Sequence, residues 1–149
     1  MRKIDMIVIH CTATRADSPL SPAELTRMHR KRGFKCCGYH YYVRTDGEIC
    51  TMRPVERAGA HARGYNERSI GIAYEGGLDE QGRPADTRTE LQKRSLRILV
   101  RVLKADFPGI TQVVVPNENN KLIEKSTNKS CTSTRELAVP DYLIKRLDS

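Results

Sequence analysis

The sequence predicts a single α/β domain, residues 1–149, with a central mixed β-sheet and helices packed on its faces. Short apolar strands alternate along the chain with two helices that carry capping signals, a pattern typical of helices covering a sheet. An Asp-Gly hairpin signal at Asp46-Gly47 adds an antiparallel pair. The length of 149 residues suits one domain, because a chain of this size buries a large core.

The strands are predicted from apolar and β-branched runs. Met6–Ile9 is uniformly apolar and reads as a strand buried on both faces. Further strands are predicted at residues 38–43, 48–52, 69–74 and 112–115. Gly71 interrupts one of them, which indicates a close backbone approach at that point.

Two helices have clear starts. Ser21, Pro22 and Glu24 form a capping box with proline at the first helical position, and this helix should end before Gly33. Thr89 and Gln92 form a second capping box. An amphipathic helix follows it, marked by Leu91, Leu96, Leu99, Val100, Val102 and Leu103. A short helix is also predicted at residues 141–147.

Composition narrows the class of protein. The net charge of +8 suits an anionic partner such as nucleic acid, a membrane surface or the cell-wall polymer. The basic residues are spread along the chain, so nucleic acid is not indicated. No apolar run approaches the ~20 residues of a membrane span, and no signal peptide is recognised, so we expect synthesis in the cytoplasm. The five cysteines lack a disulfide pattern and are interpreted as reduced thiols.

Two places are candidates for chemistry. The first strand runs into His10, and ligands often bind where strands end. A structural histidine bonded to backbone is the alternative for His10. Residues 59–66 combine two glycines with His61 and Asn66 in one connection, which favours a binding loop over a spacer.

These residues together resemble a known family. Val8–Thr14, Gly38–Tyr41, Gly59–Asn66 and Ser69–Ile72 resemble the zinc-dependent N-acetylmuramoyl-L-alanine amidases of the second type. That family includes the amidase-type phage lysozymes and the peptidoglycan recognition proteins. The resemblance extends from Ile4 to about Cys131 and implies a single amidase-like domain with a peptidoglycan groove. It also implies hydrolysis of the amide between N-acetylmuramate and L-alanine of peptidoglycan or muropeptides. The protein would then act on the cell wall after release.

The resemblance implies a role for each matching residue. His10 and Cys131 would bind zinc, and Lys129 would stabilise the developing oxyanion. Tyr39 would orient or deprotonate the attacking water. Three further residues would line the groove and contact the muramyl peptide: His61, Arg63 and Asn66.

The sequence departs from the family at the remaining zinc ligand. The family has a histidine after the strand at Val113–Val115, where this chain reads Val115-Pro116-Asn117-Glu118. In one hypothesis Glu118 or Glu124 supplies an oxygen ligand, since zinc accepts carboxylates. In another the site has two ligands, and the protein is a catalytically inactive peptidoglycan-binding module. A third gives the basic helix at residues 22–31 a role in binding an acidic protein.

Overall fold

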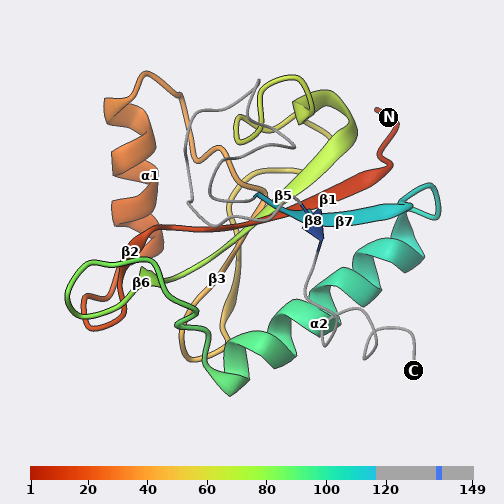
Figure 1. Cartoon of the computed structure of the whole chain (residues 1–149). Coiled ribbons are helices and arrows are strands. Elements are labelled where there is room, and N and C mark those ends of the chain that lie inside the picture. The colour runs from red at the N-terminus through yellow and green to blue at the C-terminus, as the bar shows by residue number, and fades with distance from the viewer. Residues whose placement is uncertain (117–136, 139–149) are drawn as a thin grey trace.

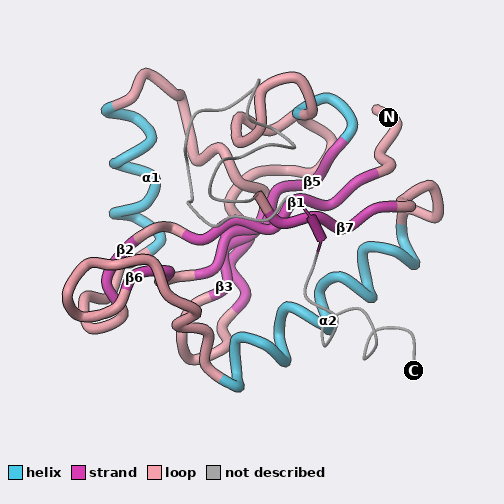
Figure 2. The backbone as a smooth tube through the Cα atoms, in the orientation of Figure 1, coloured by secondary structure: helices cyan, strands magenta, loops and turns pink. Residues whose placement is uncertain are grey.

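The structure is a computed structural model that describes residues 1–116 together with Leu137 and Ala138. Its main sheet has the strand order β4-β3-β5-β1-β7-β8 (Figures 1 and 2). The central strands β3 (Tyr41–Val43), β5 (Ser69–Tyr74), β1 (Met6–Cys11) and β7 (Gln112–Val115) are parallel. The edge strands β4 (Ile49–Thr51) and β8 (Leu137–Ala138) are antiparallel to their neighbours. The predicted mixed sheet is therefore confirmed.

The two faces of the sheet have different coverings. Side chains alternate between the faces along a strand, so Ile7 and Ile9 of β1 point one way and Met6, Val8 and His10 the other. The first face packs on α2 (Glu90–Asp106) in a core cluster. Its fully buried members include Ile7, Ile9, Ile70, Ile72, Leu96 and Val100. The second face carries His10 and is covered by α1 (Pro22–Lys31) and the loop that precedes β5.

Both helices begin as the sequence predicts. The Ser21 and Thr89 hydroxyls each accept a hydrogen bond from the backbone amide three residues ahead. The side chains of Glu24 and Gln92 in turn accept hydrogen bonds from the Ser21 and Thr89 amides. The predicted apolar pattern of α2 is only partly buried. Leu91 and Val102 are 53% and 49% exposed because they lie on the side of α2 away from the sheet.

Several strand boundaries differ from the sequence prediction. The strand predicted at residues 38–43 is confined to β3, because its first part bonds irregularly. The His40 amide donates to Gly71 O, and the Ala60 amide donates to Gly38 O. A two-residue parallel pair of β2 (Thr14–Arg15) with β6 (Gly77–Leu78) was not predicted. A short 3-10 turn, η1 (Asn66–Arg68), leads into β5. The helix predicted at residues 141–147 lies outside the described residues.

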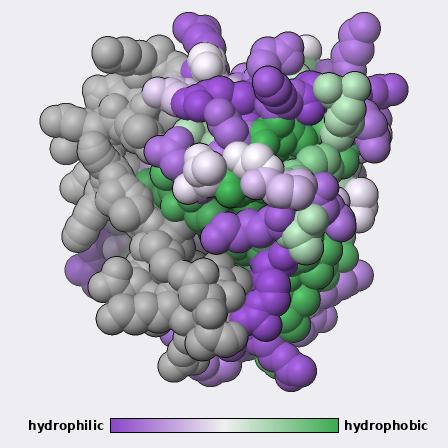
Figure 3. Space-filling view, turned by 90° about the vertical axis from the view of Figure 1, so that its right-hand side faces the viewer, coloured by the Kyte–Doolittle hydropathy of each residue, from purple (hydrophilic) through white to green (hydrophobic). Residues whose placement is uncertain are grey.

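The surface of the protein and its cysteines can be compared with the expectations from composition. On the face shown in Figure 3, hydrophobic side chains form a band flanked by hydrophilic ones. No helix in the described part of the chain is long and apolar enough to cross a membrane. Three of the described cysteines, Cys36, Cys37 and Cys50, are free thiols.

Candidate active site

A buried aromatic cluster lies on the second face of the sheet, near the end of β1. It contains His10 from β1, His61 from the loop before β5, and Tyr39 from the segment before β3. The His10 Nε2 and His61 Nδ1 atoms are 3.0 Å apart, within hydrogen-bond distance. The His10 and Tyr39 ring centroids are 5.1 Å apart. Three segments distant in sequence thus place their rings together.

Small residues of β5 make room for this cluster. The face of β5 that points to the rings carries Ser69, Gly71 and Ala73, while Ile70 and Ile72 point to α2. A Cβ added to Gly71 would lie 2.6 Å from Cγ and Nε2 of His61. The close backbone approach predicted at Gly71 is therefore confirmed, and the group that approaches is the His61 ring. The small–large alternation of residues 69–73 is a signal in the sequence for this arrangement.

Burial holds His10 and His61 neutral at physiological pH. His10 is 1% exposed, and burial together with the nearby His29 lowers its pKa to about 3. His61 is 8% exposed, and burial followed by the neighbouring His10 and His40 lowers its pKa well below the usual value. A neutral imidazole has one donor nitrogen and one acceptor nitrogen, which suits it to metal binding.

One nitrogen of His10 has no hydrogen-bond partner. Among the described residues, two buried side-chain polar atoms lack one, His10 Nδ1 and Arg53 Nε. The guanidinium of Arg53 still donates through Nη1 to Cys37 O at 2.9 Å. Buried polar atoms are nearly always paired in folded proteins, so an exception needs an explanation. An open Nδ1 on a neutral imidazole is a free metal-binding position.

The other two histidines support the fold around the site. Both have a low pKa, about 4, chiefly because of burial. His29 of α1 accepts at Nδ1 from the Gly38 amide at 2.8 Å. His40 accepts at Nδ1 from the Gly71 amide at 3.0 Å, and its Nε2 donates to Arg57 O at 2.8 Å. Their ring nitrogens hold the backbone that carries Tyr39 and His61.

The predicted groove residues occupy different environments. The side-chain oxygen of Asn66 accepts from the amides of His61 and Ala62, both at 2.9 Å, so Asn66 shapes the loop. His61 is buried against His10, whereas Arg63 is exposed. Of these three residues, Arg63 is therefore the one that presents its side chain to solvent.

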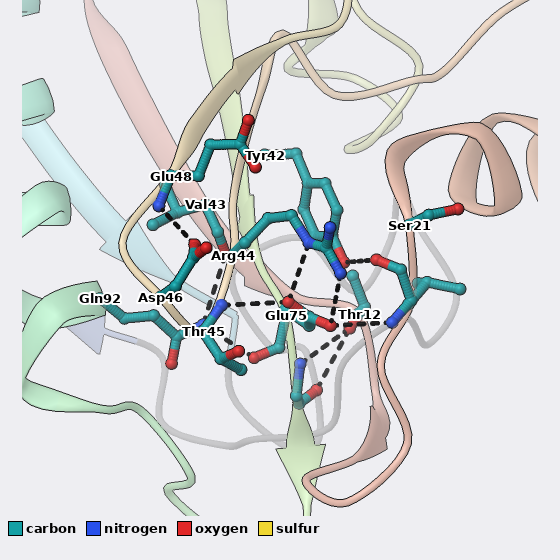
Figure 4. Close-up of polar contacts among 12 residues, drawn as sticks. Thr12, Ser21, Tyr42, Val43, Arg44, Thr45, Asp46, Glu48, Glu75 and Gln92 are labelled. Atoms are coloured by element: carbon teal, nitrogen blue, oxygen red, sulfur yellow. Dashed lines mark hydrogen bonds and ion pairs between the residues drawn. The ribbon is translucent and has the colours of Figure 1, made fainter.

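A second polar cluster at the end of β5 was missed by sequence reasoning (Figure 4). The Glu75 carboxylate is 3% exposed and accepts from the amides of Leu20 and Thr45 at 2.8 and 3.0 Å. Arg44 donates to both of its oxygens, at 3.2 and 3.4 Å. Gln92 of α2 donates to Glu75 O at 2.9 Å. This cluster ties the β3–β4 turn, α2 and the start of α1 to β5.

The remaining predicted site residues lie outside the described residues: Glu118, Glu124, Lys129 and Cys131. Within the described part of the chain, no group of three or more His, Cys, Asp or Glu side chains could hold a metal ion. Among the described residues, the open Nδ1 of His10 is thus the atom that could bind a metal ion.

The fold and this histidine at a strand end define an amidase-like class of α/β protein. Residues 1–133 match the N-acetylmuramoyl-L-alanine amidase family, and the chain belongs to that family. It is 33% identical to the endolysin of Klebsiella phage KP32 over 108 residues, 72% of each chain. It is 35% identical to the endolysin of Escherichia phage T7 over 105 residues, 70% of each chain.

Solved structures agree with this assignment. The N-acetylmuramoyl-L-alanine amidase LysC from Clostridium intestinale URNW superposes with a TM-score of 0.76 at 30% identity, covering 99% of this chain and 87% of LysC. Drosophila PGRP-LB shares the fold at 17% identity, with a TM-score of 0.67, covering 89% of this chain and 76% of its own. The predicted family, fold class and hydrolase class are confirmed.

Proposed function

We propose that this amidase uses zinc to hydrolyse the amide between N-acetylmuramate and L-alanine in peptidoglycan or its muropeptide fragments. The observation that carries the proposal is the open, buried Nδ1 of His10 at the end of β1. The endolysin relatives support a role in breaking the cell wall after release from the cell. The positive net charge of +8 favours association with an anionic wall.

The described donor fits zinc. A neutral imidazole nitrogen is a common zinc ligand, and His10 is held neutral by burial. We assign Cys131 as the second protein ligand and Glu118 as the substitute for the missing family histidine. When bound, zinc supplies Lewis-acid chemistry: it polarises an amide carbonyl and lowers the pKa of a water molecule.

The protein's own groups then bind and orient the substrate. Tyr39 is 9% exposed with its ring beside His10, so it is suited to orient the attacking water. We assign Lys129 to the charge that develops on the carbonyl oxygen. The exposed guanidinium of Arg63 is suited to pair with a carboxylate of the stem peptide.

The test measures zinc content and peptide release on the same preparation. Untagged protein should contain about one zinc ion per chain and should release stem peptides with a free N-terminal L-alanine from purified peptidoglycan. His10→Ala should lose both properties. Zinc-loaded protein that releases no such peptides would overturn the proposed activity.

The missing family histidine favours one other function, a peptidoglycan-binding module without catalysis. Such a protein would sediment with purified peptidoglycan, contain no zinc and release no peptide. Wall binding that survives in His10→Ala does not separate the two functions, so zinc content and peptide release decide between them.

A further inference from the structure

The four histidines of this chain differ in how their Nδ1 atoms are used. In His29, His40 and His61, Nδ1 lies within hydrogen-bond distance of a partner, whereas Nδ1 of His10 has no partner. We propose that Ser69 and His61 are positioning residues, which lock His10 in the one tautomer that leaves its Nδ1 lone pair open. This inference rests on the proposed function in one respect: the open lone pair would serve to bind zinc.

The direction of the hydrogen bonds is set at Ser69. Its hydroxyl has one proton, which it donates to Tyr65 O at 2.7 Å, because a carbonyl oxygen can only accept. Ser69 Oγ also lies 3.4 Å from His61 Nε2. Since the serine proton is already used, Ser69 must accept in this second contact. The proton between them therefore belongs to His61 Nε2.

The same reasoning extends from His61 to His10. A neutral His61 that carries its proton on Nε2 has a lone pair on Nδ1. His10 Nε2 lies 3.0 Å from that lone pair and must be the donor. A second proton on His61 is disfavoured by complete burial and by the nearby guanidinium groups of Arg2 and Arg53. His10 Nε2 therefore carries the proton.

The consequence falls on the other nitrogen of His10. A neutral imidazole protonated on Nε2 presents a lone pair at Nδ1, which is the buried atom without a partner. Metal-binding histidines commonly donate their second N–H to a fixed partner, and that partner sets the tautomer and the ring orientation. The unusual feature here is that the partner is another imidazole, which needs Ser69 to fix its own tautomer.

The test reads tautomers directly in the metal-free protein. Long-range ¹H–¹⁵N NMR of the untagged, zinc-free protein distinguishes an imidazole protonated on Nε2 from one protonated on Nδ1. We expect both His10 and His61 to be protonated on Nε2. A His10 protonated on Nδ1 would overturn the inference, whether or not the protein hydrolyses peptidoglycan. Fixed Nε2 tautomers in a protein without zinc or activity would support the inference and refute only the proposed function.

Ser69→Ala tests the origin of the lock. Without the hydroxyl, the His61 Nε2 proton loses its acceptor, so both histidines should become mixtures of tautomers. We expect the Kd for Zn²⁺ to rise about tenfold, a usual effect of losing such an outer hydrogen bond. Unchanged tautomers and an unchanged Kd in this variant would contradict the role of Ser69.

Ser95→Ala is the matched control. Its hydroxyl also donates to a backbone carbonyl, Gly47 O at 2.6 Å, but on α2 away from the histidines. This variant should keep the wild-type tautomers and zinc affinity. If Ser69→Ala does not fold, the tautomers of the wild-type protein still decide the proposal.

Discussion

The Glu75 cluster and the His10–His61 pair are both buried and polar, yet they are completed differently. Each oxygen of Glu75 accepts two hydrogen bonds, from Arg44 and from the Leu20 and Thr45 amides (Figure 4). The His10–His61 pair uses three of its four ring nitrogens and leaves His10 Nδ1 open. The first group is fully satisfied by the protein, and the second is not.

This difference indicates that the Glu75 cluster has a structural role and the His10–His61 pair a functional one. A buried charge with all its partners present stabilises a particular arrangement of chain segments, and Glu75 joins four of them. An unsatisfied buried nitrogen costs stability and persists where a ligand completes it. The comparison therefore predicts that substitutions in the Glu75 cluster lower the unfolding free energy, whereas substitutions of His10 remove metal binding and activity.

The largest expected effect is on activity, in His10→Gln. The glutamine amide nitrogen reaches the position of Nε2 and preserves the hydrogen bond to His61, but nothing replaces the Nδ1 lone pair. Peptide release should fall at least about a thousandfold, equivalent to roughly 4 kcal/mol of transition-state stabilisation. Urea unfolding should change little. Full activity in this variant would show that the open nitrogen is not the functional feature.

The next effect is on stability, in Glu75→Gln. The amide group would face the donors of Arg44, Leu20 and Thr45 and leave some of them unpaired. Unfolding free energy should fall by about 3 kcal/mol, as expected when one partner of a buried ion pair is removed. The remaining folded protein should keep its zinc content. Glu90→Gln is the control, because Glu90 pairs with Lys93 at the surface, 85% exposed, and should leave the unfolding midpoint unchanged.

Gly71→Ala should affect both properties, because the added methyl group displaces the His61 ring. Overpacking of this kind costs about 2 kcal/mol, measured by urea unfolding, and should weaken zinc binding. The double variant Gly71→Ala/His61→Ala removes the ring that the methyl group strikes. It should recover part of the stability without recovering zinc affinity. Strictly additive effects of the two changes would show that the ring and the glycine do not interact.

The smallest effect concerns pH. The folded-state pKa of His29 is about 4, below the 6.5 of an unperturbed histidine. The unfolded chain therefore binds more protons between these values, and unfolding free energy decreases as pH falls from about 6.5 toward 4. His29→Asn keeps an acceptor for the Gly38 amide but cannot titrate. Between pH 6 and 5 it should lose about 1 kcal/mol less stability than the wild type. An equal loss in both proteins would assign the pH dependence elsewhere.

Local sequence signals were sufficient for most of the fold. The capping boxes at Ser21 and Thr89 located both helix starts, because they depend on contacts within four residues. The Asp46-Gly47 turn and the apolar run of β1 were equally local, and Gly47 has the positive φ that the turn requires. The boundaries of β3 were missed because Gly38 and His40 bond to residues distant in sequence.

The candidate site was predictable only in part. Resemblance of motifs singled out His10, Tyr39 and His61, and the structure brings their rings together. The assignment of Cys131, Lys129 and Glu118 stays a prediction. The Glu75 cluster had no sequence signal, because its partners come from three separate segments, around Leu20, Arg44-Thr45 and Gln92.

The sequence alone determined the amidase family, the order of the two helices and the longer strands, and the alternation of small and large side chains in β5. These properties follow from residue identity and spacing along the chain. Only the tertiary structure decided which nitrogen of His10 is open and which groups surround Glu75. Hydrogen-bond direction and burial depend on the three-dimensional neighbours of each atom, and Ser69, His61 and His10 become neighbours only when the loop folds onto the sheet.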